Sequence, residues 1–130
     1  MLNFVRLLFI AFLISMIFIV FEVGKAWPNT FVPDTPERVE SLVMAIYKAE
    51  GGKGTRYPFG IKSVSCRGYE GCKRVCENTV RNNIKRWKKS VAEGDKRDYL
   101  TFLWHRYCPP NLHASNAHWK KNVLYFLGEK

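Results

Sequence analysis

The chain has 130 residues, of which 21 are Lys or Arg and 11 are Asp or Glu, so its formal net charge is +10 at pH 7. This length suits one small domain and excludes two. The positive charge favours anionic partners such as cell-wall polymers or acidic lipid headgroups, through a long-range attraction that salt weakens. Nucleic acid is the usual partner of so basic a chain, but the export signal described next argues against it.

An apolar run opens the chain. Residues 7–21 are apolar except for Ser15, and one positive charge precedes them. Gly24-Lys25-Ala26 then places small residues where signal peptidase prefers them. The pattern predicts a secretory signal, residues 1–26, and a periplasmic or secreted domain, residues 27–130. The alternative is an inner-membrane anchor formed by residues 7–21, although this run is short of the ~20 residues that a spanning helix needs.

The spacing of apolar residues predicts a first helix. Thr35 can cap it, Pro36 suits its first position, and Gly51-Gly52 ends it. Its apolar stripe consists of Val39, Leu42, Val43, Ile46 and Ala49. Glu50 falls on the same stripe, where a carboxyl group loses hydration, so that its pKa rises and it can donate a proton near neutral pH. The alternative is that Glu50 swings out to solvent from the last turn.

Residues 53–66 are rich in glycine and aromatic side chains and predict a loop with at most a short irregular hairpin. This loop directly follows Glu50 and could form one wall of a cleft. A second helix is expected from about Glu70 to Ala92. Its buried face would consist of Cys72, Cys76, Val80, Ile84, Trp87 and Val91.

Two further helices complete the expected fold. Asp95 can cap the third, and Cys108-Pro109-Pro110 stops it. The fourth begins near Asn116. The expected buried residues are Leu100, Leu103, Trp104 and Tyr107 on the third helix, and Trp119, Val123, Phe126 and Leu127 on the fourth. The fold class is therefore mostly α.

Four cysteines follow the predicted signal, and an even number in an exported chain indicates two disulfides. Three pairings are possible. We favour Cys66–Cys72, which closes a small loop, and Cys76–Cys108, which ties two helices together. Zinc is the competing use of these cysteines, with His105, His113 and His118 as further ligands, but the spacing matches no compact zinc signature. We therefore expect no metal and no other cofactor.

The residue types favour a sugar-binding cleft. No Ser/His/Asp order and no phosphate-binding glycine loop stands out. Aromatic rings can stack on sugar faces, while a carboxylic acid with a raised pKa protonates the oxygen that leaves. The candidate rings are those of Tyr57, Phe59, Trp104, Tyr107 and Trp119, each of which packing in a small core would also explain.

Five short segments, in this order, resemble motifs of the lysozyme-like lytic transglycosylases. The helix end at residues 45–50 resembles the catalytic helix of that family, and Tyr57-Pro58-Phe59-Gly60-Ile61 resembles its Gly-Leu/Ile loop. Asn83-Ile84 resembles an Asn-Ile pair on the middle helix, and Arg106-Tyr107 resembles a Tyr-Asn motif near the cleft. Residues 119–126 resemble the closing Tyr-Val-x-x-Val helix. Together the segments span nearly the whole domain.

The resemblance implies a lysozyme-like fold and cleavage of the MurNAc–GlcNAc bond of peptidoglycan. Glu50 would be the general acid and then the base on the C6 hydroxyl of the sugar, which gives a 1,6-anhydro product. Gly60 and Ile61 would join the aromatic residues as substrate-binding residues. The chain departs from the family at Gly51, where the family has Ser, at Lys62-Ser63, where it has Met-Gln, and at Cys108, where it has Asn.

Several alternatives stay open. A water-using hydrolase would need a second acid, for which Glu70, Asp95 and Asp98 are candidates. A non-catalytic basic protein could keep the fold and bind only the wall or an anionic membrane surface, and a secreted antibacterial toxin could share the chemistry. We expect a monomer whose partners are peptidoglycan glycan strands, with an anionic membrane surface as a further candidate, and which binds no nucleic acid.

Overall fold

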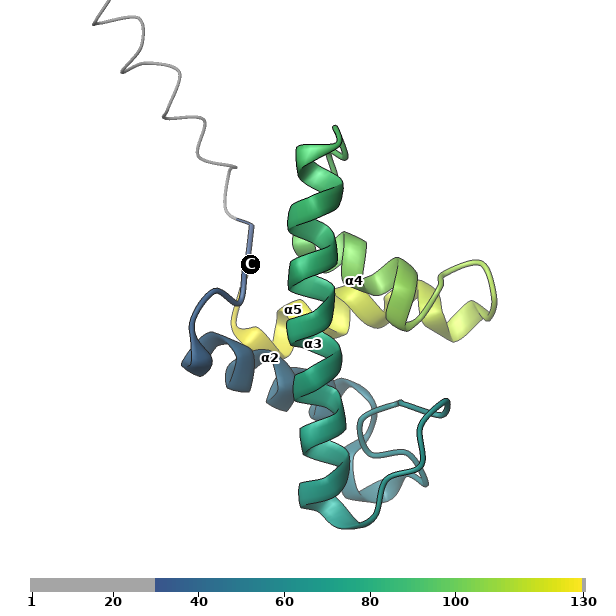
Figure 1. Ribbon diagram of the computed structural model, residues 1–130. Coiled ribbons are helices and arrows are strands. Elements are labelled where there is room, and N and C mark those ends of the chain that lie inside the picture. The colour runs from purple at the N-terminus through teal and green to yellow at the C-terminus, as the bar shows by residue number, and fades with distance from the viewer. Residues whose placement is uncertain (1–29, 130) are drawn as a thin grey trace, which may run out of the picture.

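The computed structural model describes residues 30–129, which form a small all-α domain (Figure 1). Within this range there are four α-helices, two short 3-10 helices and no strand. The α-helices are α2 (Pro36–Ala49), α3 (Gly68–Ala92), α4 (Tyr99–Tyr107) and α5 (Trp119–Leu127), and the 3-10 helices are η1 (Gly52–Gly54) and η2 (Ala114–His118). No helix in this part of the chain has the length and apolar character to cross a membrane. The predicted signal or anchor lies outside the described residues.

The first predicted helix is confirmed at both ends. The Thr35 side chain accepts a hydrogen bond from the Arg38 N–H at 3.3 Å, and Pro36 is the first helical residue. Gly51, with φ of +88°, turns the chain away directly after Glu50. The apolar stripe faces the core, and its buried members are Val39, Leu42, Val43 and Ile46. Glu50 is therefore the cap residue at the end of a helix whose inner face is fixed by packing.

Figure 1 shows α3 lying across α2 and α4. Two hydrogen bonds hold it to the segment that begins α4. The Tyr99 hydroxyl donates to the Val80 carbonyl at 3.1 Å, and the Trp87 indole donates to the Arg97 carbonyl at 2.9 Å. The observed N-cap of α4 is Asp98, so the expectation that Asp95 caps this helix is wrong.

The reason for this difference is that the two aspartates have different partners. Asp98 accepts the Thr101 N–H at 2.8 Å, as a helix cap does. The Asp95 carboxylate instead accepts hydrogen bonds from Arg97 and Ser90, at 2.6 and 2.7 Å. These hydrogen bonds hold the pKa of Asp95 well below its usual range, Arg97 having the largest effect.

Among the described residues, α5 packs most extensively against α2. Trp119 and Val123 are buried, as expected. Phe126 is 40% exposed, so its predicted burial is wrong. Leu124 and Leu127 provide the core contacts of the last turn, which turns Phe126 outward against Tyr125.

One of the two predicted disulfides is present. Cys66 and Cys72 are bonded, with 5.0 Å between their Cα atoms, and they tie the loop to the first turn of α3. Cys76 and Cys108 are both free, so the predicted second disulfide is wrong. The Cys76 sulfur instead lies 3.6 Å from the Tyr107 hydroxyl, which takes the place of a sulfur partner. The loop before Cys66 consists of the 3-10 helix η1, turns and bends, without a hairpin.

Candidate active site

The end of α2 brings the Glu50 carboxyl group into a partly enclosed position. The Glu50 N–H continues the helix by bonding to the Ile46 carbonyl at 2.9 Å. Because the backbone turns at Gly51, the Glu50 side chain stays against the body of the domain and is only partly exposed. The alternative in which this side chain swings into open solvent is therefore not observed.

A single hydrogen bond joins Glu50 to the last helix. The Trp119 indole N–H donates to Glu50 Oε1 at 2.7 Å, and the two residues are 69 positions apart in the chain. Trp119 is 4% exposed, so this bond forms largely out of water. The Tyr107 ring stacks on the Trp119 ring, with 5.3 Å between centroids and 28° between planes. The indole is thus held in one orientation behind the carboxyl group.

Opposing effects act on the Glu50 pKa. Burial of the carboxyl group is the largest, and it raises the pKa above the ordinary value of 4.5. The Trp119 hydrogen bond and the positive charge of Lys62 stabilise the carboxylate and oppose this rise. Since burial dominates, Glu50 keeps its proton to a higher pH than an exposed glutamate would.

Gly60 lies directly against the Glu50 carboxyl group. Its φ is +73°, a conformation that favours glycine. A Cβ atom at this position would lie 2.4 Å from Glu50 Cδ and 2.6 Å from Oε1. Any larger residue would therefore displace the carboxyl group, and the loop approaches Glu50 this closely only because residue 60 has no side chain.

Tyr107 fixes the loop that carries Gly60. Its hydroxyl donates to the carbonyl of Phe59, the residue just before Gly60. Burial raises the Tyr107 pKa, so the phenol remains a neutral donor. Burial also raises the pKa of the Cys76 thiol, to about 12, so this neighbour of the phenol is uncharged as well. The same Tyr107 side chain thus supports both the indole and the loop that touch Glu50.

A cleft of about 470 Å³ opens in front of Glu50. The loop that contains Gly60 forms one wall, the end of α4 and the segment after it form the other, and α3 contributes Thr79. The remaining lining residues are Ile61, Lys62, Ser63, Val64, Arg106, Tyr107, Cys108, Pro109, Ser115 and Asn116. Among the described residues that line this cleft, Glu50 is the one carboxylate. Glu70, Asp95 and Asp98, the candidate second acids, are not part of the lining.

The predicted site residues separate into those that lie at the cleft, one that lies in an adjoining hollow, and two whose rings pack elsewhere. Glu50, Gly60, Ile61 and Tyr107 line the cleft, and Trp119 lies behind the carboxyl group. Tyr57, which is 37% exposed, lines an adjoining hollow of about 380 Å³ that shares Ile61, Lys62 and Val64 with the cleft.

Phe59 and Trp104 do not present their rings to this cleft. The Phe59 ring is 2% exposed and packs against Tyr47, with 5.0 Å between ring centroids. The Trp104 indole donates to the Asn116 carbonyl at 2.8 Å, and its ring lines a separate hollow on α5. Both residues were expected to bind substrate, and in the structure their rings have packing positions.

The motif resemblance named Asn83 and Arg106, but sequence reasoning did not connect these two side chains or give them a role at the cleft. Arg106 donates from Nε to Asn83 Oδ1 at 2.9 Å, and Asn83 in turn donates to the Thr79 carbonyl at 2.9 Å. Asn83 is 6% exposed on a helix face that is otherwise apolar. A polar residue at a core position of α3 was therefore the signal that could have identified the contact between Asn83 and Arg106.

Within residues 30–129, no three His, Cys, Asp or Glu side chains lie close enough together to hold a metal ion. Comparison of the chain with protein-family models, with curated proteins and with solved structures found no match. The resemblance to lytic transglycosylases therefore stays a prediction from short motifs.

Proposed function

We propose that this protein is an exported peptidoglycan lytic transglycosylase in which Glu50 is both the general acid and the general base. The observation that carries the proposal is a partly buried carboxyl group, with a raised pKa and an indole donor behind it, at the wall of a cleft. Such a group combines a retained proton with access to a ligand, as general acid catalysis requires.

The reaction begins with the protonated Glu50. The carboxylic acid gives its proton to the glycosidic oxygen as the bond from that oxygen to C1 of MurNAc breaks. The resulting carboxylate then removes the proton from the C6 hydroxyl of the same sugar, and O6 bonds to C1. The product is a 1,6-anhydro sugar, no water is consumed, and Glu50 regains its proton.

The lining of the cleft favours this route over hydrolysis. Glycosidases that use water place a second carboxylate about 5–9.5 Å from the acid, either as nucleophile or as base. Among the described residues, the cleft has Glu50 as its one carboxylate. A mechanism in which a single group first gives and then takes a proton needs no other acid.

Glu50→Gln tests the proposal. The amide keeps an oxygen that can accept the Trp119 hydrogen bond but has no proton to donate, so cleavage of purified peptidoglycan should fall by about 10²- to 10⁴-fold. Muropeptide analysis of the wild-type products should find 1,6-anhydro ends. The matched control is Glu70→Gln, which makes the same chemical change at an exposed residue outside the cleft and should leave cleavage unchanged.

Three results would contradict the proposal. Equal cleavage by the wild type and Glu50→Gln would exclude Glu50 as the acid. Reducing ends without anhydro sugars would indicate a hydrolase. Binding to walls that salt disrupts, without any cleavage by the wild type, would favour the non-catalytic alternative.

A further inference from the structure

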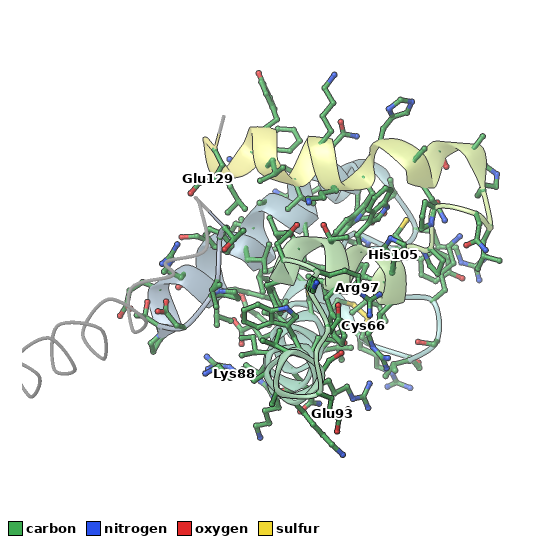
Figure 2. The ribbon with its side chains drawn as sticks, turned by 90° about the horizontal axis from the view of Figure 1, so that it is seen from above. Cys66, Lys88, Glu93, Arg97, His105 and Glu129 are labelled. Carbon is green, nitrogen blue, oxygen red and sulfur yellow. A yellow bond between two sulfur atoms is a disulfide. The ribbon has the colours of Figure 1, made fainter. Side chains whose placement is uncertain are left out.

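A stripe of four positive charges runs along the outer face of α3. It consists of Arg74, Arg81, Lys85 and Lys88, all of which are exposed. Their spacings of seven, four and three residues place them within about 60° of one another around the helix, over about 21 Å of its length. Figure 2, in which α3 is seen nearly end-on, shows Lys88 pointing away from the body of the molecule.

Within residues 30–129, nearby carboxylates form no ion pair with these four charges. Glu77, three residues after Arg74 and four before Arg81, borders the stripe and is paired with Lys73 at 3.9 Å. Glu70 lies one turn before Arg74 and marks the N-terminal limit of the stripe. The outer face of α3 therefore presents positive charge to an external partner.

The stripe and the cleft lie on different sides of α3. Thr79 is the residue of α3 that lines the cleft. Arg74 is five residues before Thr79 and Lys88 nine after, which places each about 140–180° around the helix from it. A surface that contacts the stripe would therefore leave the mouth of the cleft open.

We infer that this stripe is a docking face for a membrane surface rich in anionic phospholipid. The four charges lie along one continuous helix of 25 residues, which can present them together to a flat charged layer, and the stripe has no aromatic residue on which a nucleic-acid base could stack. The apolar run at residues 7–21 brings the chain to a membrane either as an export signal or as an anchor. This inference does not depend on the proposed catalysis.

Site-resolved lysine labelling of the full chain tests the inference, because it reports which face lies on the membrane whatever residues 7–21 do. The chain is mixed with phosphatidylglycerol/phosphatidylcholine vesicles or with phosphatidylcholine vesicles alone, and an amine-reactive acetylating reagent is applied. Labelling of Lys85 and Lys88 should fall at least threefold with the anionic vesicles, and salt should restore it. Labelling of Lys48, Lys53, Lys96 and Lys121, which are exposed elsewhere, should change little.

A pair of charge-matched variants completes the test. One replaces Arg74, Arg81, Lys85 and Lys88 with Gln, and the other replaces Lys48, Lys53, Lys96 and Lys121 with Gln. Each cation close to an anionic surface strengthens binding about fivefold. The stripe variant should therefore lose at least tenfold in phosphatidylglycerol-dependent partitioning, whereas the control variant, with the same net charge, should lose much less.

The inference is overturned if both variants lose binding equally, because net charge alone would then explain it. Uniform protection of all six lysines, or no protection by anionic vesicles, would overturn it too. A third result would overturn it as well. The wild type would bind purified walls or duplex DNA more tightly than the vesicles, and the stripe variant would lose binding to the walls or DNA but not to the vesicles. Circular dichroism of both variants shows whether a loss of binding is caused by a loss of folding. If a variant is unfolded, the lysine labelling of the wild type alone tests the inference.

Discussion

At the scale of single residues, Trp119 determines what kind of acid Glu50 is. A buried carboxyl group without a donor would strongly prefer its neutral form, while an exposed one would ionise like any glutamate. The Glu50 carboxyl group lies between these limits, because the Trp119 indole N–H offers its carboxylate form one hydrogen bond in a place that water reaches poorly. Such a group can both lose and regain a proton in one catalytic cycle.

We predict that Trp119→Phe raises the Glu50 pKa further. The variant keeps an aromatic ring but removes the donor, so burial acts with less opposition. The alkaline limb of the pH–activity profile should move to higher pH, and the ¹³Cδ resonance of Glu50 should titrate at higher pH. Trp87→Phe is the control, because it removes a buried indole that donates to the Arg97 carbonyl and has no effect on the Glu50 pKa. A Glu50 titration that is the same in both variants and in the wild type would refute this role.

Gly60 sets the distance between the loop and the carboxyl group. We predict that Gly60→Ala lowers activity by roughly 10²-fold, because a misplacement of about 1 Å at a catalytic group has an effect of that size. Gly68→Ala is a matched control, since Gly68 has a similar φ of +65° but open space where a Cβ would lie. Both variants should lose about 1–2 kcal/mol of stability from backbone strain, and only Gly60→Ala should also lose activity. Thermal unfolding curves first establish that both variants are folded. Equal activity of the two folded variants would then contradict this view.

At the scale of elements, the loop between α2 and α3 is held at two points, one in its middle and one near α3. Tyr107 fixes it beside the cleft, and the Cys66–Cys72 disulfide ties it to α3. The disulfide closes a short ring of chain, so replacing both cysteines with Ser should lower the free energy of unfolding by about 2 kcal/mol. Chemical denaturation of the variant and of the oxidised wild type measures this difference, and the stability of the variant should not respond to reductant.

The other two cysteines should behave as thiols of very different reactivity. Burial raises the pKa of Cys76 to about 12 and that of Cys108 to about 11, and Cys76 is fully buried whereas Cys108 is partly exposed. In the native protein without reductant, iodoacetamide should label Cys108 slowly and Cys76 only after unfolding. Peptide mass analysis would show this order. A native protein with no free thiol after denaturation would instead indicate a second disulfide.

The local features of α2 were predictable, whereas most contacts between segments that are distant in the chain were not. The Thr35 cap, the stripe of α2 and the position of Glu50 at its end depend on neighbouring residues, so the sequence was sufficient to predict them. The Cys76–Cys108 pairing was wrong because it depends on how α3 meets the end of α4. In the same way, the indole donor and the close approach of Gly60 depend on contacts between distant segments. The motif resemblance named both residues without giving either one this role.

At the scale of the whole molecule, the raised Glu50 pKa links folding to pH. A carboxyl group whose folded-state pKa exceeds its unfolded value of about 4.5 contributes stability that is complete below pH 4.5 and is lost as the pH rises through the folded pKa. Glu50→Gln, which does not ionise, avoids this loss. We therefore predict that the variant is more stable than the wild type at pH 7 and that the difference disappears near pH 4. Urea unfolding of both proteins at the two pH values measures it, and a wild type that is more stable at pH 7 would show that burial does not dominate.

The pairing of the first helix with the last has a consequence for when the proposed acid becomes competent. Translation and export deliver a polypeptide from its amino end, so α2 and Glu50 emerge well before Trp119 and α5. Until α5 docks, the carboxyl group is hydrated, lacks its indole donor and titrates as an ordinary glutamate. Under the proposed function, a nascent molecule would therefore be inert toward glycan until α5 has docked and folding is finished.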